Sequence, residues 1–211
     1  MSARPGQLFV VSAPSGAGKT SLVNALIEAT DGIVASVSHT TRDRRPGEQE
    51  GVDYFFVDRD EFARMADADE FLEHAEVFGN LYGTSKAEIR RTLDSGLDLV
   101  LEIDWQGARR VRALYPDTVS VFILPPSEAT LRERLVGRGR DDPATIDARM
   151  QQAMSEMSHF PEYEYLLVND DFAVALEGLR AIVIASRLKT NVGHARLGPV
   201  VADLLASADA V

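Results

Sequence analysis

Short apolar runs alternate with amphipathic segments along most of the chain. The apolar runs are rich in Val, Ile, Leu and Phe, which favours buried strands. We expect strands over residues 7–12, 33–38, 97–103, 118–124 and 165–168. The amphipathic segments predict helices over residues 19–29, 85–94, 105–114, 127–136, 143–158 and 172–188. This alternation predicts an α/β fold with a mostly parallel sheet and helices on both of its faces.

The segment from residue 39 to residue 83 departs from this alternation. It starts with a loop-rich stretch and then becomes apolar and aromatic. Its aromatic residues include Tyr54, Phe55, Phe56, Phe71, Phe78 and Tyr82. The change of pattern predicts a small, partly antiparallel insertion between two strands of the main sheet.

Two local patterns refine the predicted helices. Ser85 and Glu88 have the spacing of a capping box, which marks the start of a helix. Further along, a stripe of apolar side chains follows the helical repeat, and we expect it in the core rather than at a cofactor. The members of this stripe are Ile146, Met150, Met154 and Met157.

Composition limits the classes of function. Of the 211 residues, 45% are hydrophobic and 26% are charged, which is close to the average of globular domains. No apolar run approaches the ~20 residues of a membrane span, so we expect no membrane partner. Cysteine is absent, which excludes disulfides and fits a cytoplasmic protein. The net charge of −11 argues against nucleic-acid binding, which needs a broad basic surface.

A glycine-rich loop follows the first predicted strand. It has the P-loop pattern, with Ala13 in place of the first glycine. Gly16 and Gly18 let backbone N–H groups converge on phosphate oxygens, and the following helix directs its positive end at the same anion. Lys19 adds a charge for the β- and γ-phosphates, and the Thr20 hydroxyl can bind Mg²⁺. The pattern predicts an ATP phosphate site formed by Ala13, Pro14, Ser15, Gly16, Ala17, Gly18, Lys19 and Thr20.

Carboxylates follow another predicted strand. Glu102 and Asp104 stand at the end of the apolar run that starts at residue 97. Phosphate-transfer sites of the P-loop class use an acidic residue in this place to help hold the metal. The loop and the acidic strand end together indicate a phosphotransfer site that uses a magnesium nucleotide.

Several further segments resemble the guanylate kinase family. The resemblance extends from about residue 7 to residue 188 and implies transfer of the γ-phosphoryl group of MgATP to GMP, and to dGMP. It implies a P-loop three-layer sandwich with a mostly parallel sheet, a small mixed α/β GMP-binding insertion and a helical lid. The matching segments, besides the loop, are Ser38-His-Thr-Thr-Arg42-Asp-Arg-Arg45-Pro-Gly-Glu48, Gly51-Val-Asp-Tyr54, residues 71–84 and Asp104-Trp-Gln-Gly107.

The resemblance divides the chain into four parts. The core comprises residues 1–37, 85–125 and 159–190, and the GMP-binding region comprises residues 38–84. Residues 126–158 form the lid and its flanking helices. Residues 191–211 match no part of the family, and we expect a helix that packs on the domain or on another subunit. The choice between a monomer and a homo-oligomer stays open.

The resemblance also assigns the GMP site. The phosphate is expected on Arg42, Arg45, Tyr54 and Tyr82, and the guanine edge on Ser38, Glu73, Thr84 and Asp104. Two guanidinium groups and two phenols suit a dianion. A carboxylate at position 73 can accept both the N1–H and the amino N–H of guanine, whereas adenine has a lone pair at N1. We expect Glu48 to orient an arginine.

The remaining assignments concern the ATP side. Arg134, Arg138 and Arg149 match lid arginines that close over the ATP phosphates, where positioning and charge neutralisation drive the reaction. With Lys19 and Arg42 they form the expected catalytic set. Asn169 and Asp170 match positions near the adenine. Glu102 replaces an aspartate of many relatives, and we expect it to act on the metal indirectly.

Two other functions compete with phosphorylation of GMP. Guanylate-kinase-like domains of scaffolding proteins bind peptides without catalysis, but those domains typically lack a complete phosphate loop. A P-loop kinase of the same fold could act on another phosphorylated small molecule, although a sugar phosphate would not need Ser38, Glu73 and Thr84 together. The four histidines are scattered, and we expect structural or surface roles for them, as we expect packing for Trp105.

Overall fold

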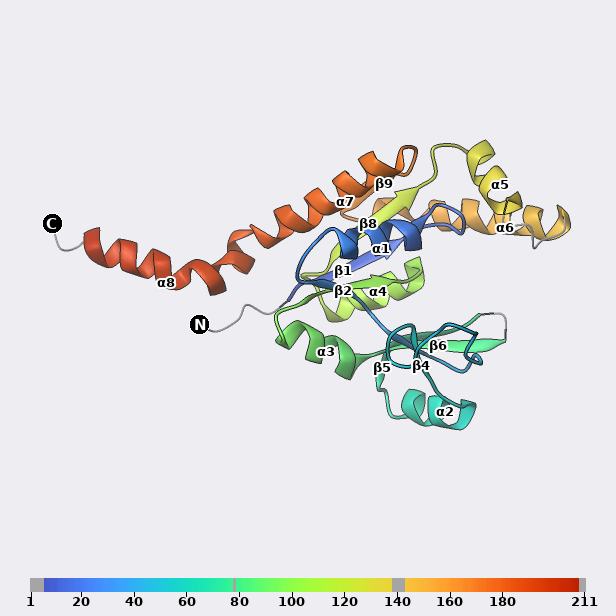
Figure 1. Cartoon of the computed structure of the whole chain (residues 1–211), viewed down its shortest axis with the longest axis horizontal. Helices are drawn as coiled ribbons and strands as arrows, with labels where there is room; N and C mark the ends of the chain where they lie inside the picture. Colours follow the sequence, from blue (N-terminus) through green and yellow to red (C-terminus); the bar gives the residue numbers. More distant parts are fainter. Residues whose placement is uncertain (1–5, 78, 138–142, 209–211) are drawn as a thin grey trace.

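The computed structural model describes residues 6–77, 79–137 and 143–208. Within these ranges, a five-stranded sheet has the order β2-β7-β1-β8-β9, and each neighbouring pair is parallel (Figure 1). Its strands are β1 (Leu8–Ser12), β2 (Ile33–Ala35), β7 (Asp98–Glu102), β8 (Val119–Leu124) and β9 (Tyr165–Val168). The prediction of a mostly parallel sheet is confirmed.

Helices cover both faces of this sheet. They are α1 (Lys19–Glu28), α3 (Lys86–Asp94), α4 (Trp105–Leu114) and α7 (Phe172–Arg187). Side chains alternate along a strand, so β1 contributes to two cores. Phe9 and Val11 are buried with α1 and α7, whereas Leu8 and Val10 are buried with α3 and α4. The result is the three-layer sandwich expected from the sequence.

The predicted strand over residues 33–38 is wrong in one respect, because the chain divides it between two sheets. β2 ends at Ala35, and the backbone N–H of Ser36 makes the last contact with β7, at Val100 O. β3 then begins at Ser38 in a second sheet. A continuous apolar pattern does not reveal such a change of partner.

The second sheet has four strands and mixed pairing. Its elements are β3 (Ser38–Thr40), β4 (Tyr54–Phe56), α2 (Arg59–Asp67), β5 (Phe71–Val77) and β6 (Asn80–Ser85). The strand order is β4-β3-β6-β5, with β3 and β4 parallel and the other pairs antiparallel. Phe62 of α2 stacks on Phe71 of β5 with ring centroids 4.5 Å apart, and Met65 is buried beside them. The predicted insertion therefore has a small core of its own.

Helices α5 (Glu128–Val136) and α6 (Pro143–Met157) pack on each other through a separate apolar cluster. Its buried members are Leu131, Leu135, Ile146, Met150 and Ala153. The expectation for Met154 is wrong, because half of its surface is exposed. Met154 lies at the edge of the stripe that runs through Ile146 and Met150. The neighbouring Ala153 is buried in the cluster instead.

The C-terminal segment forms α8 (Thr190–Ala208), which extends from α7 away from the sheets (Figure 1). Several of its large apolar side chains are exposed, namely Leu197, Val200, Val201, Leu204 and Leu205. The expected helix is present, but these five side chains do not pack on the domain. Among the described helices, none combines the length and apolar character needed to cross a membrane.

Candidate active site

The phosphate loop joins β1 to α1 and has the backbone geometry that the motif requires. Gly16 and Gly18 have φ values of 94° and 89°, in the left-handed region that disfavours side chains. A Cβ at Gly18 would also collide with the side-chain amide of Asn169. Both glycines are therefore needed to shape the loop, whereas Ala13 is accommodated at the pattern's first position.

The loop lines a cleft of about 330 Å³ at the N-terminus of α1. Asp104 and Glu156 complete its wall. Predicted ATP-site residues that line it are Ala13, Pro14, Ser15, Gly16, Gly18, Lys19 and Thr20. Ala17 of the loop is fully buried, and its carbonyl accepts a hydrogen bond from Asn169 Nδ2 at 2.7 Å.

Lys19 is partly buried in this cleft. Burial lowers the pKa of its ammonium group, and the carboxylates of Glu102, Asp104 and Glu156 act in the opposite direction. A cation in such a place is stabilised by an anionic partner. Phosphate groups on the loop would provide that partner.

Thr20 and Glu102 lie together, as expected for a metal site. Thr20 Oγ1 donates a hydrogen bond to Glu102 Oε2 at 2.9 Å. Hydroxyl and carboxylate oxygens are suitable ligands for Mg²⁺, which keeps several waters and also binds substrate phosphates. In the described part of the chain, no group of three His, Cys, Asp or Glu residues could hold a metal alone. The donor set thus fits a magnesium ion that is shared with a nucleotide.

The second sheet brings three of the predicted phosphate-binding residues together. The guanidinium carbon of Arg42 lies 5.3 Å from the ring centroid of Tyr54, and the Tyr54 and Tyr82 rings are 5.9 Å apart. Glu48 Oε1 accepts a hydrogen bond from Arg42 Nη2 at 2.7 Å, as expected for an orienting residue. Arg45 is exposed, and its backbone N–H donates to Glu48 Oε2 at 2.8 Å.

Burial raises the pKa of the Tyr54 hydroxyl, so this phenol stays protonated at neutral pH. The hydrogen bond to Glu48 raises the pKa of the Arg42 guanidinium. The cluster therefore presents a cation beside a hydroxyl donor, which is an arrangement that can bind a phosphate dianion.

The predicted guanine-binding residues lie on adjoining elements. Glu73 of β5 faces Thr84 of β6, and Thr84 Oγ1 donates a hydrogen bond to Glu73 Oε1 at 2.6 Å. Burial raises the pKa of the Glu73 carboxyl, and the bond from Thr84 opposes this effect. Asp104 is the N-cap of α4, and its carboxylate accepts a hydrogen bond from the Gly107 N–H at 2.7 Å. Ser38 lies on β3 beside Tyr54 of β4.

Arg149 of α6, in the expected lid, reaches the phosphate loop, and its Nη2 donates a hydrogen bond to Ser15 Oγ at 2.6 Å. Arg134 of α5 donates to the backbone carbonyl of Asn169 at 3.0 Å. Its Nη1 is buried, with no hydrogen-bond partner among the described residues. Asn169 is itself buried and bonded to the loop, whereas Asp170 is exposed. Arg138 lies outside the described residues.

Sequence reasoning missed Glu156, which faces the phosphate loop from α6. Burial raises the pKa of its carboxyl, while a hydrogen bond from Gln152, the nearby Lys19 and a hydrogen bond from the backbone N–H of Ser15 oppose the rise. One signal could have found this residue. It follows Arg149 by seven positions, which places both on the same face of a helix.

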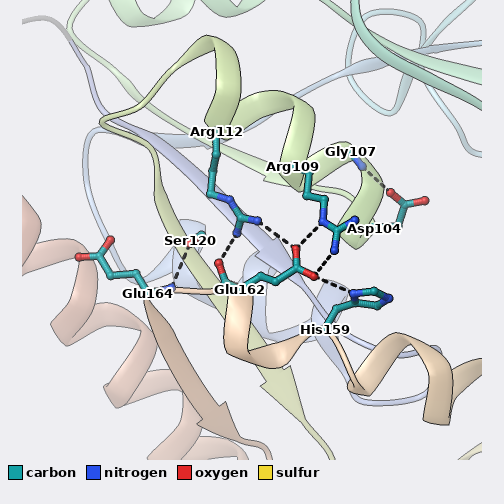
Figure 2. A network of polar contacts seen from close by, with 8 residues as sticks. All are labelled: Asp104, Gly107, Arg109, Arg112, Ser120, His159, Glu162 and Glu164. Atoms are coloured by element: carbon teal, nitrogen blue, oxygen red, sulfur yellow. Dashed lines mark hydrogen bonds and ion pairs between the residues drawn. The ribbon is translucent and has the colours of Figure 1, made fainter.

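Sequence reasoning also missed a network around Glu162, at the end of the short 3₁₀ helix η1 (Phe160–Glu162) (Figure 2). The Glu162 carboxylate accepts hydrogen bonds from Arg109 Nε at 2.6 Å and from Arg112 Nη2 at 3.4 Å, and pairs with His159 Nδ1 at 2.7 Å. The guanidinium of Arg109 holds the pKa of Glu162 at about 2. Trp105 stacks on His159 with ring centroids 3.6 Å apart. Trp105 therefore packs as expected, and His159 has a structural role, as expected for the histidines.

The network fixes the segment after α6 to α4, whose N-cap is Asp104. The network's partners are about fifty positions apart in sequence, so no local pattern indicates them. It therefore joins the base of the lid to an element of the predicted guanine site.

A phosphate loop on a parallel sheet, a second sheet with an arginine–tyrosine cluster, and a lid arginine on the loop define a P-loop nucleoside monophosphate kinase. A family model described as "Guanylate kinase" matches residues 5–186. The chain belongs to the guanylate kinase family, and this assignment makes it an ATP:GMP phosphotransferase.

Curated relatives are similar over most of the chain. The guanylate kinase of Saccharophagus degradans is 62% identical, over 87% of this chain and 89% of its own. That of Alkalilimnicola ehrlichii is 58% identical, over 95% of this chain and 99% of its own. Among solved structures, the guanylate kinase of Anaplasma phagocytophilum matches with a TM-score of 0.73 and 39% identity, over 93% and 95% of the two chains.

Proposed function

We propose that the chain transfers the γ-phosphoryl group of MgATP to GMP, and also to dGMP, through the residues assigned above. One observation carries the proposal: the second sheet holds a partly buried Glu73–Thr84 pair and an Arg42–Tyr54–Tyr82 cluster together. The pair suits the hydrogen-bond donors of a guanine edge. The cluster suits a phosphate dianion, so one sheet matches both ends of GMP.

Selection for guanine rests on the ionised Glu73 carboxylate. Thr84 donates to one of its oxygens and so orients the carboxylate toward the base. Guanine offers two N–H groups to such an acceptor, whereas adenine would place a lone pair against it. Ser38 and Asp104 complete the set of polar groups for the base. Because Glu73 is partly buried, a base that leaves it without donors would bind poorly.

The GMP phosphate binds to Arg42, Arg45, Tyr54 and Tyr82 in this proposal. Glu48 holds Arg42 Nη2 and the backbone of Arg45, which supports both arginines in one loop. A fixed phosphate places its oxygen in line with the γ-phosphoryl group of ATP. Such positioning is the main work of the protein in phosphoryl transfer.

The ATP phosphates bind to the backbone N–H groups of residues 13–20 and to Lys19. Arg134, Arg138 and Arg149 neutralise the charge that is shared by the transferred group and its neighbours. Thr20 would hold Mg²⁺, with Glu102 acting through the Thr20 hydroxyl, and the ion neutralises β- and γ-phosphate oxygens when bound. Asn169 and Asp170 lie on the adenine side.

The proposal places the reaction in the cytoplasm, where ATP and GMP are both present. ATP and GMP are its partners, and neither a nucleic acid nor a membrane is included. The net charge of −11 is opposite to that of a nucleic-acid-binding surface.

Replacing Arg42 tests the acceptor site. We expect Arg42→Ala to lower kcat/KM for GMP by about 10²-fold or more, while the KM for ATP stays nearly unchanged. Arg44→Ala is the matched control, because Arg44 is an exposed arginine of the same loop and has no assigned role. Steady-state kinetics with each substrate varied in turn measures both values. If only the KM for ATP responds, the assignment of the acceptor site is wrong.

A further inference from the structure

Four side chains form a closed ring of contacts between the start of helix α4 and the segment that follows α6. Trp105, the first residue of α4, stacks on His159 with ring centroids 3.6 Å apart and ring planes 13° from parallel. His159 Nδ1 pairs with Glu162 Oε1 at 2.7 Å, and the Glu162 carboxylate accepts two hydrogen bonds from Arg109, at 2.6 and 2.5 Å (Figure 2). The Arg109 guanidinium carbon lies 4.6 Å from the Trp105 ring centroid, which closes the ring. We call these four side chains the α4 clamp.

The segment between α6 and β9, which supplies two members of the α4 clamp, is itself anchored to the central sheet. The backbone N–H of Glu164 donates to Ser120 Oγ of β8 at 3.1 Å (Figure 2). Arg112 Nη1 adds a hydrogen bond from α4 to the backbone carbonyl of Glu162 at 2.7 Å. The α4 clamp therefore holds the helix against a segment that is fixed to the sheet.

The α4 clamp adjoins a residue of the candidate active site. Asp104 immediately precedes Trp105 and is the N-cap of α4, where its Oδ1 accepts the Gly107 N–H at 2.7 Å. Asp104 also lines the cleft of the phosphate loop, and α4 contacts β5, the strand that carries Glu73. Because an N-cap moves with the first turn of its helix, a shift of Trp105 would displace the Asp104 carboxylate.

The attachment of α4 to the core does not depend on this clamp. Ala108 and Val111 of α4 are fully buried against Leu8 and Val10 of β1 and their neighbours. Trp105 is not a member of that cluster and is partly exposed. Loss of a clamp contact should thus change the placement of the first turn of α4 more than it changes the packing of the helix.

We propose that His159 and Glu162 are positioning residues that set the place of Asp104 through Trp105 and Arg109. The proposal deepens the proposed function, on which it rests, because Asp104 is assigned there to the guanine edge. A carboxylate held in place before binding meets the base without further ordering, and small errors in its position reduce the rate strongly. The α4 clamp also ties Asp104 to the expected lid, since α6 ends two residues before His159.

Tryptophan fluorescence tests the α4 clamp without any substrate. Trp105 is the only tryptophan of the 211 residues, so the emission reports on this place alone. We expect His159→Ala to shift the emission to longer wavelength and to increase its quenching by acrylamide, because the indole loses the ring that covers it. His159→Phe keeps an aromatic ring at this position and should restore both values toward those of the unmodified chain. Unchanged emission and quenching in His159→Ala would overturn the proposal.

Steady-state kinetics tests the link to Asp104. We expect His159→Ala and Glu162→Ala each to lower kcat/KM for GMP by about tenfold, while the KM for ATP stays nearly unchanged. Asp104→Asn keeps a side chain that can cap α4 but removes the carboxylate that binds the base. In this background the same two changes should cause less than about twofold further loss, because their target is already absent.

The matched control is Glu164→Ala, which removes a carboxylate two residues after Glu162 that forms an exposed ion pair with Lys189. It should keep kcat/KM for GMP within about twofold of the unmodified chain. All rates are measured at a temperature at which thermal unfolding shows every variant to be folded. A full additional loss in the Asp104→Asn background, or an unchanged kcat/KM in His159→Ala, would overturn the proposal. Absence of GMP-dependent turnover in the unmodified chain would refute the proposed function and with it this role of Asp104, whereas unchanged fluorescence in His159→Ala would refute the α4 clamp alone.

Discussion

Two charged side chains at the ligand sites occupy surroundings that disfavour their charge. Burial lowers the pKa of Lys19 and raises the pKa of Glu73, so each charged form needs a partner. The proposed substrates supply both partners, because ATP phosphates face Lys19 and the guanine N–H groups face Glu73. Ligands that supply these partners are therefore expected to bind more tightly than ligands that do not.

Lys19 should contribute to catalysis far more than to folding. We expect Lys19→Ala to lower kcat by about 10²–10³-fold, since it removes a fixed charge at the transferred phosphates. Lys189→Ala is the control, because Lys189 is an exposed lysine that pairs with Glu164. ADP release and urea unfolding would be measured on the same samples. A loss of folding in parallel with activity would contradict the assigned role.

Glu73 should decide which base is accepted. We expect Glu73→Gln to lower kcat/KM for GMP by about 10²-fold or more, because an amide N–H would face the N–H groups of guanine. The ionised form binds GMP, so the KM for GMP should rise as the pH falls through the raised pKa of Glu73. The Glu73→Gln profile, measured in parallel, shows the part that titration of GMP itself contributes. Identical pH profiles would contradict this role.

At the scale of elements, local patterns predicted most of the helices and strands. The helix Trp105–Leu114 and the strand Tyr165–Val168 have the predicted bounds. The predicted cap at Ser85 is also present, because Ser85 Oγ accepts a hydrogen bond from the Glu88 N–H. The pattern over residues 33–38 failed because apolar character indicates burial but not the identity of the partner strand. Exposure of α8 could not be predicted for the same reason.

Site residues in one continuous segment could be predicted from the sequence, whereas contacts between distant segments could not. The phosphate loop is one continuous segment, so its glycines and Lys19 were evident from the sequence alone. The Glu156 contact and the Glu162 network join residues that are distant along the chain, and they become visible only after folding. The family resemblance bridged this gap for Glu73 and Thr84, which the structure places in hydrogen-bond contact.

The Glu162 network should stabilise the junction between η1 and α4. We expect Glu162→Gln to lower the free energy of unfolding by about 1 kcal/mol at pH 7, allowing for solvent screening of a partly exposed group. The folded pKa of Glu162, about 2, lies below its unfolded value. The stabilisation is therefore complete above the unfolded pKa and is lost as the pH falls through about 2.

Urea unfolding at several pH values measures this effect. The difference between the unmodified chain and Glu162→Gln should be constant near neutral pH and should shrink in acid. Glu164→Gln is the control, since Glu164 forms an exposed ion pair with Lys189, and should change stability by less than about 0.5 kcal/mol. A difference that grows in acid would contradict the account.

At the scale of the whole molecule, the acceptor and donor regions belong to different parts of the fold. In Figure 1 the second sheet, with α2, lies below the central sheet, whereas helices α5 and α6 lie at its upper right. The phosphate loop follows the C-terminal end of β1 and leads into α1. This arrangement lets the two nucleotides approach the loop from different elements. The Glu162 network links η1, which follows the expected lid helix α6, to α4 (Figure 2). Helix α4 in turn contacts β5 of the second sheet.

The most direct test of the central claim is a coupled ADP-release assay with MgATP and one acceptor at a time. The acceptors are GMP, dGMP, AMP, CMP and UMP. We expect turnover with GMP of at least several per second, about the usual range for kinases, and turnover with AMP slower by orders of magnitude. ADP release that is independent of the acceptor, or equal rates with GMP and AMP, would contradict the claim that this chain is a GMP-specific phosphotransferase.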